Sequence, residues 1–300
     1  RQPMYNEVEN IADTVAKIKT AMRDFSGAWE FILVNDGSTD GSFERARELT
    51  AGEQNIRVIG YDVNRGRGAA LRTGFDEARG RIVATVDFDL SYSPDHILRM
   101  YDVLAGSPSV DMVMASCYMP GGAVEGVPPK RLWISRVGNI ILREAFGRRF
   151  YTTTCVVRAY RREVLEALSL ESERKEIHLE ILSRALALGF NVVEIPATLR
   201  SRAKGSSKFT FVRTSLTHLA FAFKENPAFL VKVLLVVFTV AAIPPVLYVF
   251  LRRLDWHNRS IDYPCPLVAA PLVKIAVVLG AAYLCSVCFG LVMQRLKDIH

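Results

Sequence analysis

Residues 29–52 read WEFILVNDGSTDGSFERARELTAG: a short apolar run, then a polar turn, then a charged stretch that favours a helix. The pattern continues with NIRVIGY (55–61) before AALRTGFDEARG (69–80), and with RIVATVD (81–87) and VDMVMAS (110–116). Between the last two runs, Ser93 and Pro94 predict the start of another helix, with Pro94 as its first residue. Strands that alternate with helices in this way indicate an α/β domain on a Rossmann-like, mainly parallel sheet.

Two acidic motifs follow predicted strands, at the sheet edge where α/β domains bind ligands. Asp36 lies in the turn NDGSTDGS, and Asp87 and Asp89 end the run RIVATVDFD. Because side chains alternate along a strand, Asp87 and Asp89 should point to one side while Phe88 points into the core. Two carboxylates placed in this way can hold a hard divalent cation such as Mg²⁺, together with substrate phosphates.

Each motif also has a plainer interpretation. The two aspartates can form a solvated strand end, and NDGSTDGS can be a polar turn in which Ser38 or Asp40 caps the next helix. Where Asp36 faces a ligand, it can accept hydrogen bonds from a base or a ribose. The loop NRGRG (64–68) offers backbone donors and Arg67 to phosphates, but it lacks the third glycine of a dinucleotide-binding fingerprint.

The composition points to a membrane rather than to nucleic acid. The chain has 300 residues, is 50% hydrophobic and carries a formal net charge of +7, which suits either an anionic membrane or nucleic acid. No nucleic-acid-binding motif is present, and the apolar excess gathers after residue 228. The five cysteines fit neither a disulfide scaffold nor a zinc site.

Two apolar runs, about 228–251 and 267–293, each exceed the roughly 20 residues that cross a bilayer. Their short linker predicts a transmembrane hairpin after an α/β domain that spans 1–208. Residues 209–227 should form an amphipathic helix, either in the membrane interface or packed on the core. At the other end, RQPMYNEVEN enters a helix-like stretch with no strand before it, so we expect the natural chain to begin upstream of residue 1.

Six segments carry a resemblance to family 2 glycosyltransferases, which have the GT-A fold. They occur in the order PMYNE (3–7), ILVNDGSTDGS (32–42), NRGRGAALRTGFDEARG (64–80), DFDLS (87–91), RAYRREVLEAL (158–168) and EIPATLRSRAKGSSKF (194–209). Over about residues 3–209 the chain looks like the polyprenyl-phosphate sugar synthases, which include the dolichol-phosphate mannose synthases and their bacterial glucosyl relatives. The predicted hairpin is similar to that of the membrane-anchored members.

The resemblance implies an inverting, metal-dependent transferase that moves one hexose from a nucleotide sugar to a polyprenyl or dolichyl phosphate. The catalytic domain would be cytosolic, where sugar nucleotides are made. The residues implied for the nucleotide are Pro3, Tyr5, Glu7, Asp36 and Asp87. Asp87 would also lie near the metal, and Asp89 would hold Mg²⁺ or Mn²⁺. The positions implied for the acceptor phosphate are Arg131, Ser135, Arg202 and Lys208.

The chemistry of the acceptor agrees with this assignment. A phosphate monoester is already ionised near neutral pH, so it needs cations rather than a strong base to approach an anionic diphosphate. The alternatives are a solvated basic face around Arg131 and Arg136, and a juxtamembrane patch at RSRAKGSSK (200–208) that binds anionic lipids. Glu180 occupies a position where relatives carry an acidic residue that faces the site; its role stays open, with a structural salt bridge as the alternative.

Two departures from the family pattern leave the donor open between GDP-mannose and UDP-glucose. Residues 115–117 read Ala-Ser-Cys where relatives often have Gly-Ser-Arg, and Ser91 stands where the mannose group often has glutamine. A glycan-extending synthase is a second hypothesis, although no glutamine begins a Q-x-x-R-W motif. A third is a membrane scaffold that binds nucleotide sugars without turnover. The sequence leaves open whether copies associate as a homo-oligomer through the membrane helices.

Overall fold

The computed structural model describes residues 2–146, 149–201 and 211–254. The chain divides into two compact units, residues 1–225 and 226–300. The predicted second membrane span, 267–293, therefore lies outside the described residues, as do Arg202 and Lys208.

The first part of unit 1 is a parallel sheet with the strand order β1-β2-β3. Its strands are β1 (Gln2–Met4), β2 (Phe31–Asp36) and β3 (Ile56–Tyr61), and its helices are α1 (Ile11–Ala21), α2 (Ser42–Leu49) and α3 (Arg67–Asp76). Every residue of β2 is buried, because Phe31 and Leu33 pack in the α1 and α2 core while Ile32 and Val34 pack with Ala70 of α3. The expectation of no strand before α1 is wrong: Gln2–Met4 pairs with β2.

The second sheet has the order β4-β7-β5-β8 and is mixed, with β5 and β8 parallel. Its strands are β4 (Ile82–Thr85), β5 (Met112–Ser116), β7 (Arg158–Arg161) and β8 (Val192–Pro196). The sheet is mixed because β7, which was not predicted from the sequence, runs antiparallel to both β4 and β5. One residue after β8 the chain forms β9 (Thr198–Arg200), which pairs with β6 (Ala123–Glu125).

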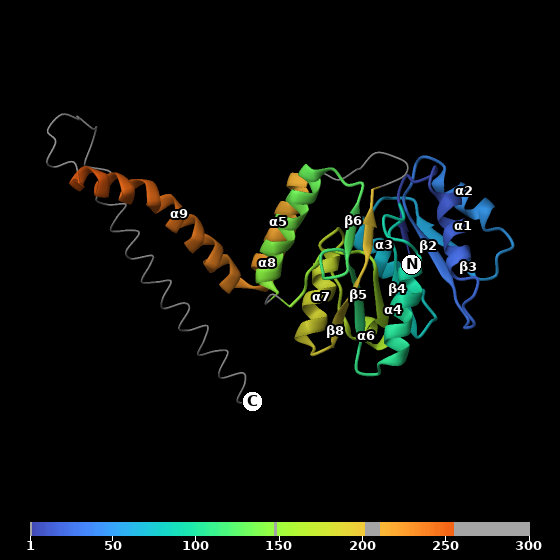
Figure 1. The fold of residues 1–300 in the computed structure, drawn as a ribbon. Coiled ribbons are helices and arrows are strands. Elements are labelled where there is room, and N and C mark those ends of the chain that lie inside the picture. The colour runs from blue at the N-terminus through green and yellow to red at the C-terminus, as the bar shows by residue number, and fades with distance from the viewer. Residues whose placement is uncertain (1, 147–148, 202–210, 255–300) are drawn as a thin grey trace. The chain divides into compact units, whose positions relative to one another are not determined.

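Helices cover both faces of the second sheet (Figure 1). They are α4 (Asp95–Gly106) on one face, and α6 (Arg162–Ala167) and α7 (Ile177–Ala187) on the other. Side chains of β5 alternate between them: Val113 packs in the α4 core and Met112 in the α7 core. Helix α4 begins one residue later than predicted, with Pro94 at the position before its first turn.

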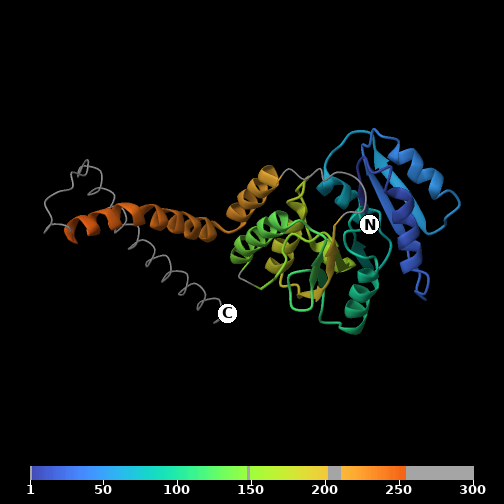
Figure 2. The ribbon, with the colours of Figure 1, turned by 45° about the horizontal axis from the view of Figure 1, so that its top comes forward.

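Two further helices complete unit 1, α5 (Pro129–Ala145) and α8 (Phe211–Glu225). Helix α8 contacts α5 and α7, and the views in Figures 1 and 2 agree that it lies beside α5. Helix α8 lies within the range 209–227 for which an amphipathic helix was predicted. The predicted boundary at residue 208 falls inside unit 1.

In unit 2 the structure describes one helix, α9 (Pro227–Leu254), where the first membrane span was predicted. Much of its described surface is apolar; its exposed large apolar side chains are Val231, Leu234, Val236, Val237, Phe238, Val240, Ile243 and Val246. Within the part of the chain that the structure describes, no helix has the combination of length and apolarity needed to cross a membrane.

Two glycines in the turn after β2 allow a test of how closely this turn packs against the loop before α3. Gly37 (φ +68°) and Gly41 (φ +81°) both have left-handed backbones, but only at Gly37 would an added Cβ meet the backbone, 2.4 Å from the nitrogen of Asn64. We expect Gly41→Ala to lower the free energy of unfolding by about 1 kcal/mol, and Gly37→Ala by about 3 kcal/mol. Urea denaturation of the purified chain, followed by circular dichroism, measures both. Equal losses would show that the contact with Asn64 is not tight.

Candidate active site

A cavity of about 1140 Å³ opens at the carboxyl ends of β2 and β4. This volume lies just above the range of about 300–1,000 Å³ that is typical of small-molecule sites. The predicted site residues within the described ranges all line it: Pro3, Tyr5, Glu7, Asp36, Arg67, Asp87, Asp89, Arg131 and Ser135. The fold thus brings together residues that lie up to 132 positions apart in the chain, from Pro3 to Ser135.

The segment after β1 is fixed to the turn after β2 by hydrogen bonds. The backbone N–H of Asn6 donates to Ser38 Oγ (3.0 Å) and that of Glu7 donates to Ser42 Oγ (2.9 Å). These bonds hold Tyr5 and Glu7 at the cavity wall. Burial opposes the ionisation of Asp40, but hydrogen bonds from the Ser42 hydroxyl and from backbone N–H groups lower the pKa of Asp40 below its usual value.

Asp36, the last residue of β2, is only 4% exposed and binds the loop before α3. Its carboxylate accepts hydrogen bonds from the backbone N–H of Arg65 (2.8 Å) and Gly66 (3.1 Å), and from Asn64 Nδ2 (3.2 Å). A buried carboxylate is costly unless it is bonded in this way. Asp36 therefore shapes the cavity by holding this loop in place.

The loop NRGRG was expected to offer backbone N–H donors to phosphates. This is wrong for three of its N–H groups, and the N–H of Ala69, just after the loop, is also occupied within the protein. Arg65 and Gly66 donate to Asp36, while Gly68 (2.7 Å) and Ala69 (3.3 Å) donate to the carbonyl of Glu173. What this loop presents to the cavity is the side chain of Arg67.

The two aspartates of the D-x-D motif lie beyond the strand rather than on it, because β4 ends at Thr85. The expected division of roles still holds: Phe88 is buried in the core of the first sheet, and Asp87 and Asp89 line the cavity. The Phe88 carbonyl accepts a hydrogen bond from the hydroxyl of Thr14 (3.0 Å), which fixes the turn against α1.

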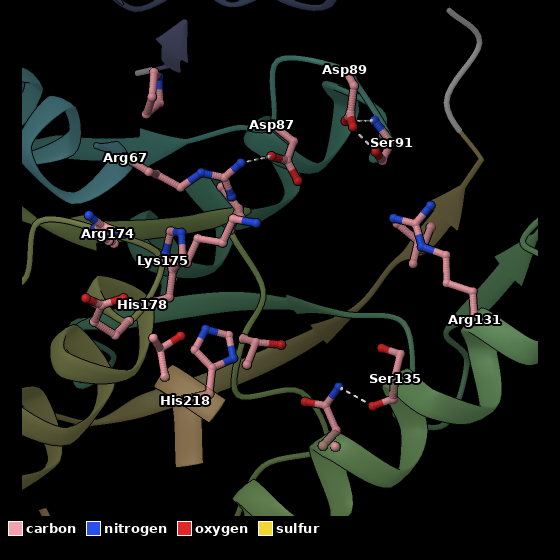
Figure 3. Close-up of a pocket in the computed structure, with 18 of the residues that line it drawn as sticks. Arg67, Asp87, Asp89, Ser91, Arg131, Ser135, Arg174, Lys175, His178 and His218 are labelled. Carbon is pink, nitrogen blue, oxygen red and sulfur yellow. Dashed lines mark hydrogen bonds and ion pairs between the residues drawn. The ribbon is translucent and has the colours of Figure 1, made fainter. Parts of the chain in front are cut away.

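Each aspartate has its own polar partner, as Figure 3 shows. Asp87 Oδ1 lies 4.0 Å from Arg67 Nη2, and Asp89 Oδ1 accepts hydrogen bonds from the backbone N–H (3.0 Å) and the hydroxyl of Ser91. Within the described residues, no group of three or more His, Cys, Asp or Glu side chains could hold a metal. Two carboxylates suit Mg²⁺ or Mn²⁺, provided that phosphates or water complete the coordination.

Helix α5 supplies a second wall, with Arg131 and Ser135 one turn apart. Ser135 Oγ accepts a hydrogen bond from the Tyr118 hydroxyl (2.8 Å), and Asn139 Nδ2 donates to the Ser135 carbonyl (3.1 Å). Burial raises the pKa of Tyr118, which keeps its hydroxyl protonated as a donor. Arg136 does not line this cavity and lies over the Tyr118 ring, 5.9 Å from its centroid.

Two histidines in the wall were not identified from the sequence. His178 of α7 is 3% exposed, and neither of its ring nitrogens has a hydrogen-bond partner among the described residues. Burial, followed by the charges of Arg158 and Arg67, lowers the pKa of His178 well below its usual value. Burial and Lys175 lower the pKa of His218, on α8, to about 4. Both are therefore neutral at pH 7, and no spacing rule marks such isolated histidines as site residues.

Comparison with known proteins shows which family this chain resembles. The sequence pattern of Glycosyl transferase family 2 matches residues 3–169. The chain is 34% identical to the polyprenol monophosphomannose synthase of Mycolicibacterium smegmatis, over 69% of this chain and 79% of that protein. It is 32% identical to the dolichol-phosphate mannosyltransferase of Pyrococcus furiosus, over 69% of this chain and 57% of that one.

A relative and a solved structure with other chemistry are also similar. The undecaprenyl-phosphate 4-deoxy-4-formamido-L-arabinose transferase of Salmonella choleraesuis is 29% identical, over 70% of this chain and 62% of the relative. This chain therefore spans less than two thirds of the Salmonella and Pyrococcus proteins. A crystal structure of glucosyl-3-phosphoglycerate synthase from Mycobacterium tuberculosis, with Mn²⁺, UDP and phosphoglyceric acid, covers 75% of this chain and 76% of its own. Its TM-score is 0.59 at 18% identity, which establishes a shared GT-A fold.

The family match covers more than half of the 300 residues and includes the turn after β2 and the D-x-D motif. The chain belongs to glycosyl transferase family 2.

Proposed function

We propose that the protein transfers a single hexose from a nucleotide sugar, GDP-mannose or UDP-glucose, to a polyprenyl or dolichyl phosphate. The product is a lipid-phosphate-linked sugar with an inverted anomeric centre. The observation that carries the proposal is that Asp87 and Asp89 line the same cavity as Arg131 and Ser135. A pair of carboxylates suits a metal-bound diphosphate, and an arginine one helical turn from a hydroxyl suits a phosphate monoester.

The reaction requires two anions to approach each other. An oxygen of the lipid phosphate attacks the anomeric carbon, and the bond from that carbon to the nucleoside diphosphate breaks. Two unit charges 4 Å apart repel by about 4 kcal/mol at an effective dielectric constant of 20. Arg131 on one wall, and Arg67, Arg174 and Lys175 on another, offset this repulsion for the two substrates.

The proposed site needs no strong general base, because the attacking phosphate is already ionised near pH 7. Asp87 and Asp89 would hold Mg²⁺ or Mn²⁺, which supplies positive charge to the leaving diphosphate. Arg131 would bind the lipid phosphate, and the Ser135 hydroxyl, oriented by Tyr118, would donate a hydrogen bond to it. Arg202 and Lys208, which lie outside the described residues, are proposed as further acceptor cations.

The relatives support the lipid acceptor and the metal. Polyprenol, dolichol and undecaprenyl phosphates occur in the names of the similar curated proteins, although the sugars differ among them. Crystal structures of the M. tuberculosis synthase contain Mn²⁺ or Mg²⁺ with UDP. We further propose that the apolar segments 228–251 and 267–293 keep the chain at the bilayer, with unit 1 on the cytosolic side. This part of the proposal rests on the sequence.

A direct assay tests the function. Purified full-length protein should convert decaprenyl or dolichyl phosphate to a sugar-phospholipid when one of GDP-mannose and UDP-glucose is supplied with Mn²⁺, and EDTA should remove the activity. Mass spectrometry of the lipid extract identifies the product. If neither these donors nor a wider panel of sugar nucleotides gives a product, the proposal is wrong.

Asp89→Asn tests the role of the carboxylate charge. The amide oxygen can still accept the two hydrogen bonds from Ser91, so the turn should persist while the metal loses a ligand. We expect kcat to fall by a factor of about 10² to 10³. Asp62→Asn is the matched control, since Asp62 is exposed and does not line the cavity, and it should leave kcat unchanged. Equal activity of the two variants would contradict the metal assignment.

Arg131→Gln tests the acceptor site. Loss of a charge-assisted hydrogen bond, worth about 1.5–3 kcal/mol, should raise the KM for the lipid phosphate by a factor of about 10 to 100 and leave the donor KM unchanged. Arg136→Gln makes the same charge change on the same helix but outside the cavity, and it should alter neither constant. Steady-state kinetics with each substrate varied in turn measures both KM values. If the two variants change the KM values equally, the cause is a general effect of surface charge and the acceptor assignment is wrong.

A further inference from the structure

Glu180 does not face the cavity, although the family resemblance suggested an acidic residue there. It is 2% exposed, and its two carboxylate oxygens accept hydrogen bonds from the backbone N–H of Glu171 (2.9 Å) and Ser172 (2.8 Å). Arg184, one turn later on α7, lies 2.9 Å from the same carboxylate. The salt-bridge alternative is therefore correct. In addition to Arg184, Glu180 binds backbone N–H groups of the segment before α7.

That segment, residues 171–175, is held against α3 from the other side. The Glu173 carbonyl accepts the N–H groups of Gly68 (2.7 Å) and Ala69 (3.3 Å), and the Ser172 carbonyl accepts from Arg72 Nη1 (3.1 Å). The approach is so close that a Cβ on Gly68 would lie 2.2 Å from the Ser172 carbonyl oxygen. The position of the segment thus determines where α3 begins, and Arg67 is the first residue of α3.

The segment also carries three cavity residues of its own, Glu173 and the two cations Arg174 and Lys175. Figure 3 shows Arg67, Arg174 and Lys175 on the same side of the cavity, away from Arg131 and Ser135. We call Arg67, Arg174 and Lys175 the cationic wall. Two of these cations lie on the segment that Glu180 binds, and the third begins the helix that this segment caps.

We propose that Glu180 is a positioning residue that sets the cationic wall, and through it the affinity for the anionic diphosphate of the sugar donor. The inference rests on the proposed function. It predicts that a change at Glu180 affects the donor and spares the acceptor, because Arg131 and Ser135 are on α5, which does not belong to this network.

The chemistry of a glutamine at this position makes the test specific. A carboxylate accepts at both oxygens, whereas an amide accepts at one oxygen and presents an NH₂ group to the second backbone N–H. The substitution Glu180→Gln therefore leaves one buried N–H opposite a donor and removes the charge that pairs with Arg184. The side chain keeps its volume, so the apolar core around α7 stays filled.

Glu171→Gln is a matched control. Glu171 Oε1 also pairs with Arg184, at 3.3 Å, but its side chain is 75% exposed and accepts no backbone hydrogen bond of the segment in the described contacts. Both variants remove one carboxylate from the same arginine. Only Glu180→Gln removes the acceptor that holds the segment.

Steady-state kinetics and nucleotide binding test the proposal on the full chain. We expect Glu180→Gln to raise the donor KM about tenfold, while the acceptor KM stays within twofold of wild type. Isothermal titration with GDP or UDP and Mn²⁺ should show a similar loss of affinity. Glu171→Gln should leave all three values within twofold. A protein that is merely less stable would instead lose kcat, through a smaller folded fraction, with both KM values unchanged.

A second variant covers the case in which Glu180→Gln does not fold. Arg72→Gln removes the hydrogen bond to the Ser172 carbonyl of this segment, and a longer one to the Leu170 carbonyl just before it, and should raise the donor KM about threefold. The inference is overturned if the folded variants leave the donor KM and nucleotide affinity unchanged, or if donor and acceptor KM rise together. Absence of transfer by the wild type would instead contradict the proposed function, and the nucleotide titration would still test the inference.

Discussion

A buried carboxylate must be bonded or it destabilises the fold, and this constraint organises the site. Asp36 satisfies it with backbone N–H groups of the loop before α3, and Glu180 with those of the segment before α7. The Glu173 carbonyl joins the two systems at Gly68. The first and second sheets thus share one hydrogen-bonded framework around the cavity, although no strand pairing links them among the described residues.

Asp87 and Asp89 line the cavity, as Asp36 also does, but they are only partly buried, whereas Asp36 and Glu180 are buried. Their turn is anchored by the buried Phe88 and by the hydrogen bonds from Ser91 to Asp89. Acidic groups between walls that carry Arg67 on one side and Arg131 on the other produce a site of mixed charge. Such a site suits a metal-bound diphosphate next to a second phosphate better than it suits a single anion.

The sequence predicted those strands and turns whose formation depends on neighbouring residues in the chain. The apolar runs of β2, β3 and β5, and the acidic turns after β2 and β4, followed from residue type and spacing. Strand β7 did not, because RAYR is short and polar: Arg158 is fully buried there only because carbonyls of Thr153, Cys155 and His178 accept its N–H groups. The same holds for His218 and for the role of Glu180, which depend on contacts between elements distant in sequence.

The proposed reaction requires Asp87 and Asp89 to bind a divalent cation together with the phosphates of a nucleotide. Titration of Mn²⁺ into the full-length protein, followed by electron paramagnetic resonance, tests it most directly. Two carboxylates alone should bind Mn²⁺ weakly, and addition of the nucleoside diphosphate of the donor should produce tight binding of one ion, which Asp89→Asn weakens. Tight Mn²⁺ binding without nucleotide, or no binding with it, would contradict the account.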